Sequence, residues 1–177
     1  TLGDGGYSGT LSPGDGYVAS FARELPPGAE VRFERLYVYW TWSRIDQAAS
    51  YPTMEARLGG PGGPVLGRAA RYADSKGFAS KNDYFSGMDS YLLPCPAGNR
   101  VTVLVNNTAE DGSTFIVQGT ALLTVYEDPG VPESAIWVAE GADLLYRSYG
   151  IPPEIATTRV EFPGRIDLPQ VKSARIL

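Results

Sequence analysis

The chain has 177 residues and a formal net charge of -5, and its 43% hydrophobic and 20% charged residues are typical of one folded domain. It contains no histidine and one cysteine, which excludes Ser-His or Cys-His nucleophile pairs and any cysteine-rich zinc site. The acidic balance and the scattered Lys and Arg residues argue against nucleic acid as a partner. No apolar run approaches the ~20 residues that cross a bilayer, so we expect no membrane span. The sequence begins with Thr1 rather than Met, which favours a processed, secreted protein.

The first predicted elements are a glycine-rich arm and a long aromatic strand. Residues 1–16 place glycines between short polar side chains, which predicts a loop or a loosely held arm. Residues 31–42 are rich in aromatic and β-branched types, which predicts a strand at the centre of a sheet. The apolar alternation changes phase at Glu34–Arg35, so we expect a β-bulge or a break there. After that point Trp40 and Trp42 share one parity and should face the same side.

The remaining strands are expected to be short. Residues 73–90 are polar, and we expect a long surface loop there with at most one short edge strand. About eight to ten short strands, long Gly- and Pro-rich loops and little helix predict an all-β protein, a β-sandwich or jelly roll. We divide the chain into an arm (1–16), a β-sandwich domain (17–170) and a terminal strand (171–177). Further strands are predicted at residues 54–58, 101–105, 115–117 resuming at 120–126, 136–138, 159–162 and 171–177.

Several blocks of the sequence carry a family resemblance. The longest joins Leu122–Pro129 to Ile136–Leu145, and shorter ones are Leu36–Trp40, Asn99–Val103 and Phe162–Gly164. Together they resemble an uncharacterised domain family that recurs in secreted and cell-surface proteins of methanogenic archaea. The resemblance implies a β-rich architecture and an extracellular location but no chemistry. In that family the pattern usually continues into a second β-rich half, which this sequence does not contain.

The aromatic residues of the long strand have two interpretations. Tyr37, Tyr39, Trp40 and Trp42, together with Tyr51, could stack on sugar rings, because aromatic faces combine apolar area with a defined orientation. Packing in the core and between the sheets is the more common use of such residues. The same side chains therefore fit either a carbohydrate-binding surface or the hydrophobic core.

Carboxylates are the remaining candidates for chemistry. A glycosidase needs two of them across a sugar cleft, whereas polar turns and capping explain these acidic residues without catalysis, so we expect no enzymatic activity. Loop oxygens could bind Ca²⁺, although turn chemistry explains Asp and Asn beside Gly equally well. The densest acidic spots are Glu127, Asp128, Glu133, Glu140 and Asp143, and the candidate Ca²⁺ ligands are Asp4, Asp15, Asp74, Asn82, Asp83, Asp89, Asn106 and Asp111.

Cys95 and Asn106 are candidates for covalent modification. Cys95 lies between two prolines and is the odd cysteine of a protein that we expect to be secreted. It could form a disulfide with another chain or fill a small buried apolar site. Asn106 begins the sequon Asn106-Asn107-Thr108 in a predicted turn after a strand, where we expect a glycan on an envelope protein.

These observations favour a non-enzymatic structural subunit of an extracellular polymer, such as a sheath, surface layer or filament of an archaeal cell. We expect copies of the chain to associate by strand addition, in which the arm or the terminal strand pairs with an open sheet edge of a neighbour. The alternative is a secreted carbohydrate-binding module that uses the aromatics from Tyr37 to Trp42. In the first hypothesis the terminal strand contributes Val171, Ala174, Ile176 and Leu177, and Cys95 serves as a covalent lock.

Overall fold

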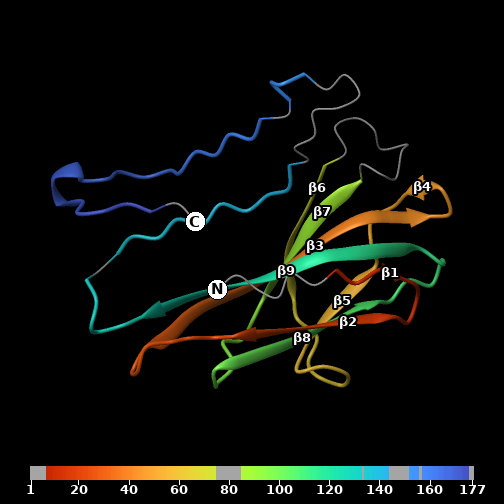
Figure 1. Ribbon diagram of the computed structural model, residues 1–177, viewed down its shortest axis with the longest axis horizontal. Coiled ribbons are helices and arrows are strands. Elements are labelled where there is room, and N and C mark those ends of the chain that lie inside the picture. The colour runs from red at the N-terminus through yellow and green to blue at the C-terminus, as the bar shows by residue number, and fades with distance from the viewer. Residues whose placement is uncertain (1–6, 75–84, 133, 144–151, 156, 176–177) are drawn as a thin grey trace.

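The structure, a computed structural model, describes residues 7–74, 85–132, 134–143, 152–155 and 157–175 (Figure 1). These residues contain two antiparallel sheets that share one hydrophobic core, so the predicted all-β sandwich is confirmed. In this part of the chain the only helix is a single 3-10 turn at Leu168–Gln170.

The two sheets differ in size. The larger sheet has the order β1 (Thr10–Leu11), β9 (Thr114–Glu127), β3 (Glu30–Ile45), β7 (Ser86–Leu92) and β6 (Arg68–Asp74), and β4 (Ala48–Ala49) pairs with the end of β3. The smaller sheet has the order β2 (Gly16–Ala22), β8 (Arg100–Asn107) and β5 (Met54–Leu58). β3, with 16 residues, pairs with both β9 and β7 and is therefore the central strand of the larger sheet, as the aromatic sequence predicts.

Side chains from both sheets meet in this core. On β3 every second residue from Leu36 to Trp40 is fully buried, and on β8 Val101, Val103 and Val105 approach from the opposite sheet. This is the strand period of two, with one face of each sheet turned inward. Each fully buried side chain of this kind contributes about 1.5–3 kcal/mol relative to exposure, so the alternation alone determines which faces meet.

The prediction of a surface loop over residues 73–90 is wrong at the C-terminal end of this range, where the structure has the buried strand β7. β7 lies between β3 and β6, and its residues Met88–Tyr91 are buried. The polar composition is misleading because Asp89 and Ser90 are polar residues inside the protein, where ion pairs and hydrogen bonds replace water. Residues 75–84 of the predicted loop lie outside the described residues.

The glycine-rich arm is held more firmly than its composition predicts. β1 pairs with β9, Leu11 is buried, and Ser8 exchanges hydrogen bonds with Val117. Asn107 of β8 donates a 2.9 Å hydrogen bond to the carbonyl oxygen of Leu11. The second half of the arm is therefore an edge of the sandwich, and only residues 1–6 lie outside the described part.

The predicted strands after β9 are not found in the described residues. Residues 136–138, 159–162 and 171–175 make no strand pairing, and their stretches run beside and away from the sheets (Figure 1). An apolar pattern forms a strand only where a neighbouring edge can satisfy its backbone groups. Residues 176–177 lie outside the described part, and exchange of this terminal stretch with another subunit stays a prediction.

β3 carries three irregularities in its register with β9. The first falls at Arg32 rather than at the predicted Glu34–Arg35, and the strand continues through it without a break. The second lies between Tyr39 and Trp40, and the third places Trp42 and its neighbour opposite a single residue of β9. Bulges of this kind change the direction in which the following side chains point.

One buried ion pair joins the two sheets. Arg23, directly after β2, donates a 2.9 Å hydrogen bond to Glu34 of β3, and both side chains are at most 1% exposed. Arg23 also donates to the carbonyl oxygens of Pro96 and Gly98, and Thr124 donates to Glu34 at 2.8 Å. Arg23 Nε and Glu34 Oε2 have no hydrogen-bond partner among the described residues, so the pair is only partly satisfied.

Replacing Arg23 with leucine should lower the free energy of unfolding by about 3–5 kcal/mol, because Glu34 then remains as an uncompensated buried charge. The double variant Arg23→Leu, Glu34→Leu should lose less than the sum of the single changes, since two apolar side chains need no partner. Urea unfolding of the two single variants and the double variant measures this coupling. An Arg23→Leu variant within about 0.5 kcal/mol of the parent would contradict the assignment.

Candidate functional site

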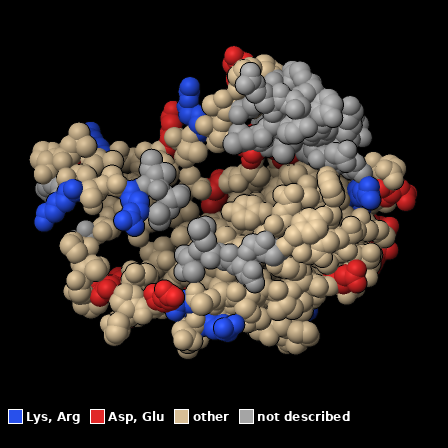
Figure 2. Space-filling view, viewed as in Figure 1, with Lys and Arg blue, Asp and Glu red and all other residues tan. Residues whose placement is uncertain are grey.

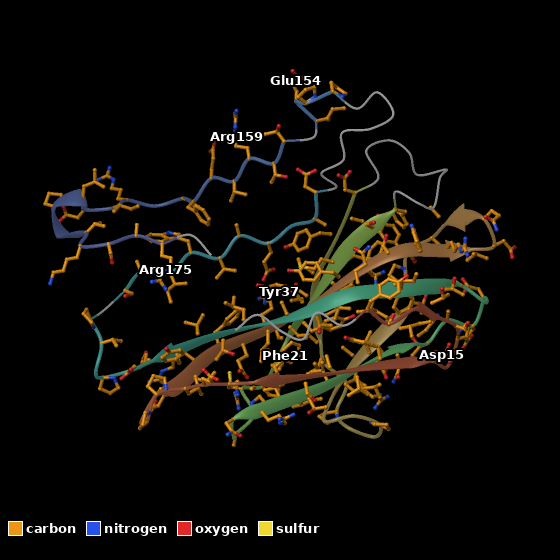
Figure 3. All side chains as sticks on the ribbon, in the orientation of Figure 1. Asp15, Phe21, Tyr37, Glu154, Arg159 and Arg175 are labelled. Atoms are coloured by element: carbon orange, nitrogen blue, oxygen red, sulfur yellow. The ribbon has the colours of Figure 1, made fainter. Side chains whose placement is uncertain are left out.

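The face of the larger sheet that points away from the core carries a mixed set of side chains. On β3 it presents Phe33, Arg35, Tyr37 and Tyr39, which alternate with the core-facing residues. Residues 134–143, which we call the outer segment, return over this face and reach Tyr37 (Figure 3). Lys and Arg residues are scattered over the surface shown in Figure 2 and form no basic stripe on it.

The outer segment is anchored by Glu140. Arg35 Nη1 donates to both carboxylate oxygens, at 2.8 and 2.7 Å, and the Tyr37 hydroxyl donates to Oε1 at 2.8 Å. The Glu140 side chain is 12% exposed, whereas the described residues between Ser134 and Ala139 are exposed. Glu140 therefore holds the segment against the sheet through charge-assisted hydrogen bonds.

Two side-chain hydrogen bonds connect the outer segment to residues 157–165. Trp137 Nε1 donates to the carbonyl oxygen of Pro163 at 3.0 Å, and the Thr158 hydroxyl donates to Asp143. These contacts follow each other in antiparallel order. The two stretches thus lie along each other without a backbone ladder between them, in agreement with the cyan and blue traces of Figure 1.

The aromatic candidates of β3 divide between the core and the outer face. Trp40 is fully buried, and its Nε1 donates to Asp89 at 3.1 Å. Tyr37 is half-buried and bound to the outer segment. Tyr39 and Trp42 are 41% and 44% exposed, so these two offer free ring surface.

Trp42 faces outward because of the third irregularity of β3. Sequence parity places it on the same side as Trp40, but the bulge reverses the alternation, and Thr41 and Ser43 are buried in its place. Trp42 has a φ of 49°, a left-handed conformation that costs an L-residue about 1–2 kcal/mol. The sequence prediction of a shared face for the two tryptophans is therefore wrong.

A pocket lies where these irregularities meet. The register shift between Tyr39 and Trp40 leaves Gln118 of β9 as the extra residue, and Gln118 is exposed. Tyr39, Trp42 and Gln118 line a pocket of ≈ 480 Å³. Its other lining residues are Trp40, Thr41, Asp74, Ser86, Gly87, Gly141, Ala142 and Asp143.

A charge cluster that was not predicted from the sequence lies on the core side of the larger sheet. Asp89 of β7 is fully buried and accepts hydrogen bonds from Arg71 at 2.7 and 2.6 Å and from Arg68 at 3.3 Å. Trp40 and Tyr91 also donate to it. In the sequence, this cluster is visible only as an isolated Asp89 close to the aromatic Tyr91, with Arg68 and Arg71 in the preceding strand.

Of the two candidates for covalent modification, Cys95 lies in a loop and Asn106 lies in a strand. Cys95 is half-exposed in the loop after β7, with a φ of 46°, and Arg23 binds the carbonyl oxygens of Pro96 and Gly98 in the same loop. Asn106 lies within β8 rather than in the predicted turn, and its side chain is half-buried. The turn begins only after the strand has ended at the next residue, and both modifications stay predictions.

The predicted acidic spots are bound locally. Glu127 accepts a 2.6 Å hydrogen bond from Arg32, which lowers the pKa of this exposed carboxyl. Asp128 accepts from the backbone N–H of Gly130 at 2.8 Å and so shapes the turn after β9. Glu133 lies outside the described residues.

The loop oxygens considered for Ca²⁺ do not gather at one place in the described residues. Asp15 accepts from the N–H of Ser12 and Asp111 from the N–H of Ser113, as in ordinary turns. In the described ranges no three His, Cys, Asp or Glu side chains form a group that could hold a metal ion. Asp4, Asn82 and Asp83 lie outside these ranges.

The predicted assembly residues of the C-terminal stretch are exposed where the structure describes them. Val171 is 43% exposed, Ala174 is exposed, and Ile176 and Leu177 lie outside the described part. Among the described residues no helix is long and apolar enough to cross a membrane.

Taken together, these features define an all-β sandwich protein with an extra C-terminal stretch beside its larger sheet. The chain belongs to a protein family of unknown function, DUF3344, which it matches over residues 1–177. No curated protein and no solved structure matches the chain. The resemblance noted in the sequence is thus supported as membership of an uncharacterised family, and its archaeal and cell-surface part stays a prediction.

Replacing Glu140 with glutamine should release the outer segment from the sheet, because Arg35 and Tyr37 lose the charged acceptor. We expect faster hydrogen exchange and faster chymotryptic cleavage at Trp137, with the free energy of unfolding of the sandwich changed by at most about 1 kcal/mol. Glu127→Gln, which removes an exposed carboxylate outside this contact, is the matched control. Unchanged exchange in the Glu140→Gln variant would show that other contacts hold the segment.

Alkaline pH should destabilise the protein through two tyrosines. Burial and the neighbouring Glu140 raise the pKa of Tyr37, and burial and Asp89 raise the pKa of Tyr91. In the unfolded chain both titrate near the ordinary value of ~10. The contribution of the two tyrosines to the free energy of unfolding is therefore complete below about pH 10, and it is lost as the pH rises toward the pKa values of the folded state. Urea midpoints at pH 8, 10 and 11 should fall, and Tyr37→Phe should reduce that fall; a midpoint independent of pH would contradict this.

Proposed function

We propose that this protein is a non-enzymatic structural subunit of an extracellular polymeric assembly, a sheath, surface layer or filament of an archaeal cell envelope. Copies join by inter-subunit β-strand addition. The observation that carries the proposal is the free outer edge of β9. Within the described residues, β1 and Ser8 occupy that edge only as far as Val117, and Gln118–Glu127 have no strand partner on that side.

The free part of β9 lacks the usual protection of an edge strand. No charged residue occurs in β9 from Thr114 to Tyr126. Natural sheet edges are commonly blocked by charges, prolines or short length, and β6 at the opposite edge carries Arg68, Arg71 and Asp74. β2 is also uncharged but has only 7 residues, so β9 offers the longer acceptor edge.

The C-terminal stretch supplies a donor of suitable composition. Its apolar side chains are exposed, including Phe162 at 52%, Leu168 at 74% and Val171 at 43%. Residues 157–175 form no strand pairs with the described part of the chain, and a short helical turn at Leu168–Gln170 interrupts them. Addition to a neighbouring edge would satisfy their backbone groups and remove this apolar surface from water.

Three further features support a structural role. Two of the carboxylates considered for glycoside hydrolysis are held in ion pairs, Glu127 with Arg32 and Glu140 with Arg35. Cys95 is half-exposed in a loop ordered by Arg23, a setting that suits a covalent lock between copies. A glycan on Asn106 would cover the outside of the smaller sheet and leave β9 accessible.

Deleting residues 170–177 should convert polymers into soluble monomers, because it removes the predicted terminal strand 171–177 from the donor stretch. Tyr126→Lys should weaken assembly by placing a charge at the acceptor edge. Val18→Lys on β2 is the matched control and should leave assembly intact, because Val18 is an exposed apolar residue (57%, against 40% for Tyr126) on the other uncharged edge strand. Negative-stain electron microscopy and size-exclusion chromatography provide the measurement.

Unchanged polymers of the truncated chain would reject strand donation by the C-terminal stretch. Loss of assembly in Val18→Lys but not in Tyr126→Lys would reject β9 as the acceptor edge. On a non-reducing gel, a dimer band that disappears in Cys95→Ser would support the covalent lock, and its absence from native polymers would remove that element of the proposal.

A further inference from the structure

Two bulges in neighbouring strands direct one side chain each into the same pocket. The irregularity at Trp42 turns this indole out of the core, and the irregularity opposite Tyr39 and Trp40 does the same for Gln118. Both residues line the ≈ 480 Å³ pocket together with Tyr39. Bulges are enriched beside functional sites, where they re-aim a side chain.

The conformation of Trp42 has no explanation in packing. A φ of 49° is an outlier for a bulky residue, and glycine would adopt it without strain. The indole is 44% exposed, so the strained backbone does not bring it into the core. Strain of this kind persists where a side chain is needed in one place, which assigns the position to a ligand rather than to stability.

The lining of the pocket identifies the chemistry of that ligand. Tyr39 and Trp42 offer flat apolar faces, which suit the C–H face of a sugar ring. The Gln118 amide both donates and accepts hydrogen bonds, which suits the hydroxyl groups of a sugar. The described lining residues include no Lys or Arg that could pair with a negatively charged sugar.

We propose that this pocket binds a pyranose ring of a neutral glycan, with Trp42 as the main stacking surface. The pocket volume falls within the range of about 300–1,000 Å³ that small-molecule sites occupy. Of the aromatic residues that the sequence suggests for sugar binding, Tyr39 and Trp42 belong to this site, whereas Trp40 is buried in the core. Gln118 was not predicted. It does not depend on strand exchange between subunits.

A quaternary ammonium group is the competing ligand, because aromatic rings and carboxylates also attract cations. Such cages enclose the cation with several aromatic faces. Here two aromatic rings are exposed, and the remaining polar lining includes the hydroxyls of Thr41 and Ser86, which bind each other at 2.7 Å. Two rings cannot enclose a cation in this way, and the Gln118 amide together with these hydroxyls favours a polyhydroxylated ligand.

The test is a tryptophan fluorescence titration of the full chain with cellohexaose, mannohexaose and chitohexaose, each to about 10 mM, one decade above a Kd of 1 mM. At least one neutral oligosaccharide should change the emission saturably. Trp42→Gly, followed by calorimetry because one fluorophore is lost, should weaken that binding about tenfold while leaving the melting temperature unchanged or higher. Trp42→Phe should retain most of the affinity.

Trp137→Phe is the matched control, since Trp137 is 42% exposed but does not line the pocket, and it should bind like the parent. Binding that Trp42→Gly does not weaken would overturn the assignment of the site. Failure of all three neutral oligosaccharides to bind would overturn the proposal, as would tighter binding of choline or of an oligogalacturonate.

Discussion

The larger sheet depends on the buried carboxylate of Asp89. It accepts hydrogen bonds from Trp40 of β3, from Arg68 and Arg71 of β6, and from Tyr91 of its own strand, so that three neighbouring strands are joined at one point on the core side. A fully buried carboxylate is tolerated only when it is paired and hydrogen-bonded in this way. By holding the Trp40 indole in the core, this contact sets the phase of β3, and the phase decides that Tyr37 and Tyr39 face outward.

The Arg23–Glu34 pair has the corresponding role between the sheets. It connects the end of β2 to β3 and, through the carbonyl oxygens of Pro96 and Gly98, orders the loop that carries Cys95. Charge therefore organises the interior of this protein, while the outer face of the larger sheet is organised by aromatic side chains and the single anchor Glu140. The outer edge of β9 and the exposed pocket residues Tyr39, Trp42 and Gln118, where exchange or binding would take place, are not members of these two networks.

Much of the architecture could be predicted from residue patterns. The alternation in β3 and β5 indicates strands because one face must be buried and the other solvated, the continuous run of apolar residues and Thr in β8 indicates a further strand, and the Gly- and Pro-rich turns limit helix. β7 could not be predicted in the same way, because its polar residues indicate a loop in the sequence, whereas in the structure Asp89 is buried with two arginines of β6 and Ser90 binds Glu140. After β9 the error is the reverse, a predicted strand that does not form. The apolar patterns there indicate strands, but no edge in the described chain pairs with them.

The candidate site shows the same division between sequence and structure. The sequence alone determined that the protein is all-β, that it lacks histidine chemistry, and that aromatic residues concentrate between Tyr37 and Trp42. Only the tertiary structure decided which aromatics are accessible, because that depends on register shifts against β9 and not on residue type. A bulge moves Trp42 to the opposite face from Trp40 and brings it together with Gln118, 76 positions further along the chain. Residue patterns report how much of a strand is buried, whereas the pairing partner determines where each side chain of that strand finally points.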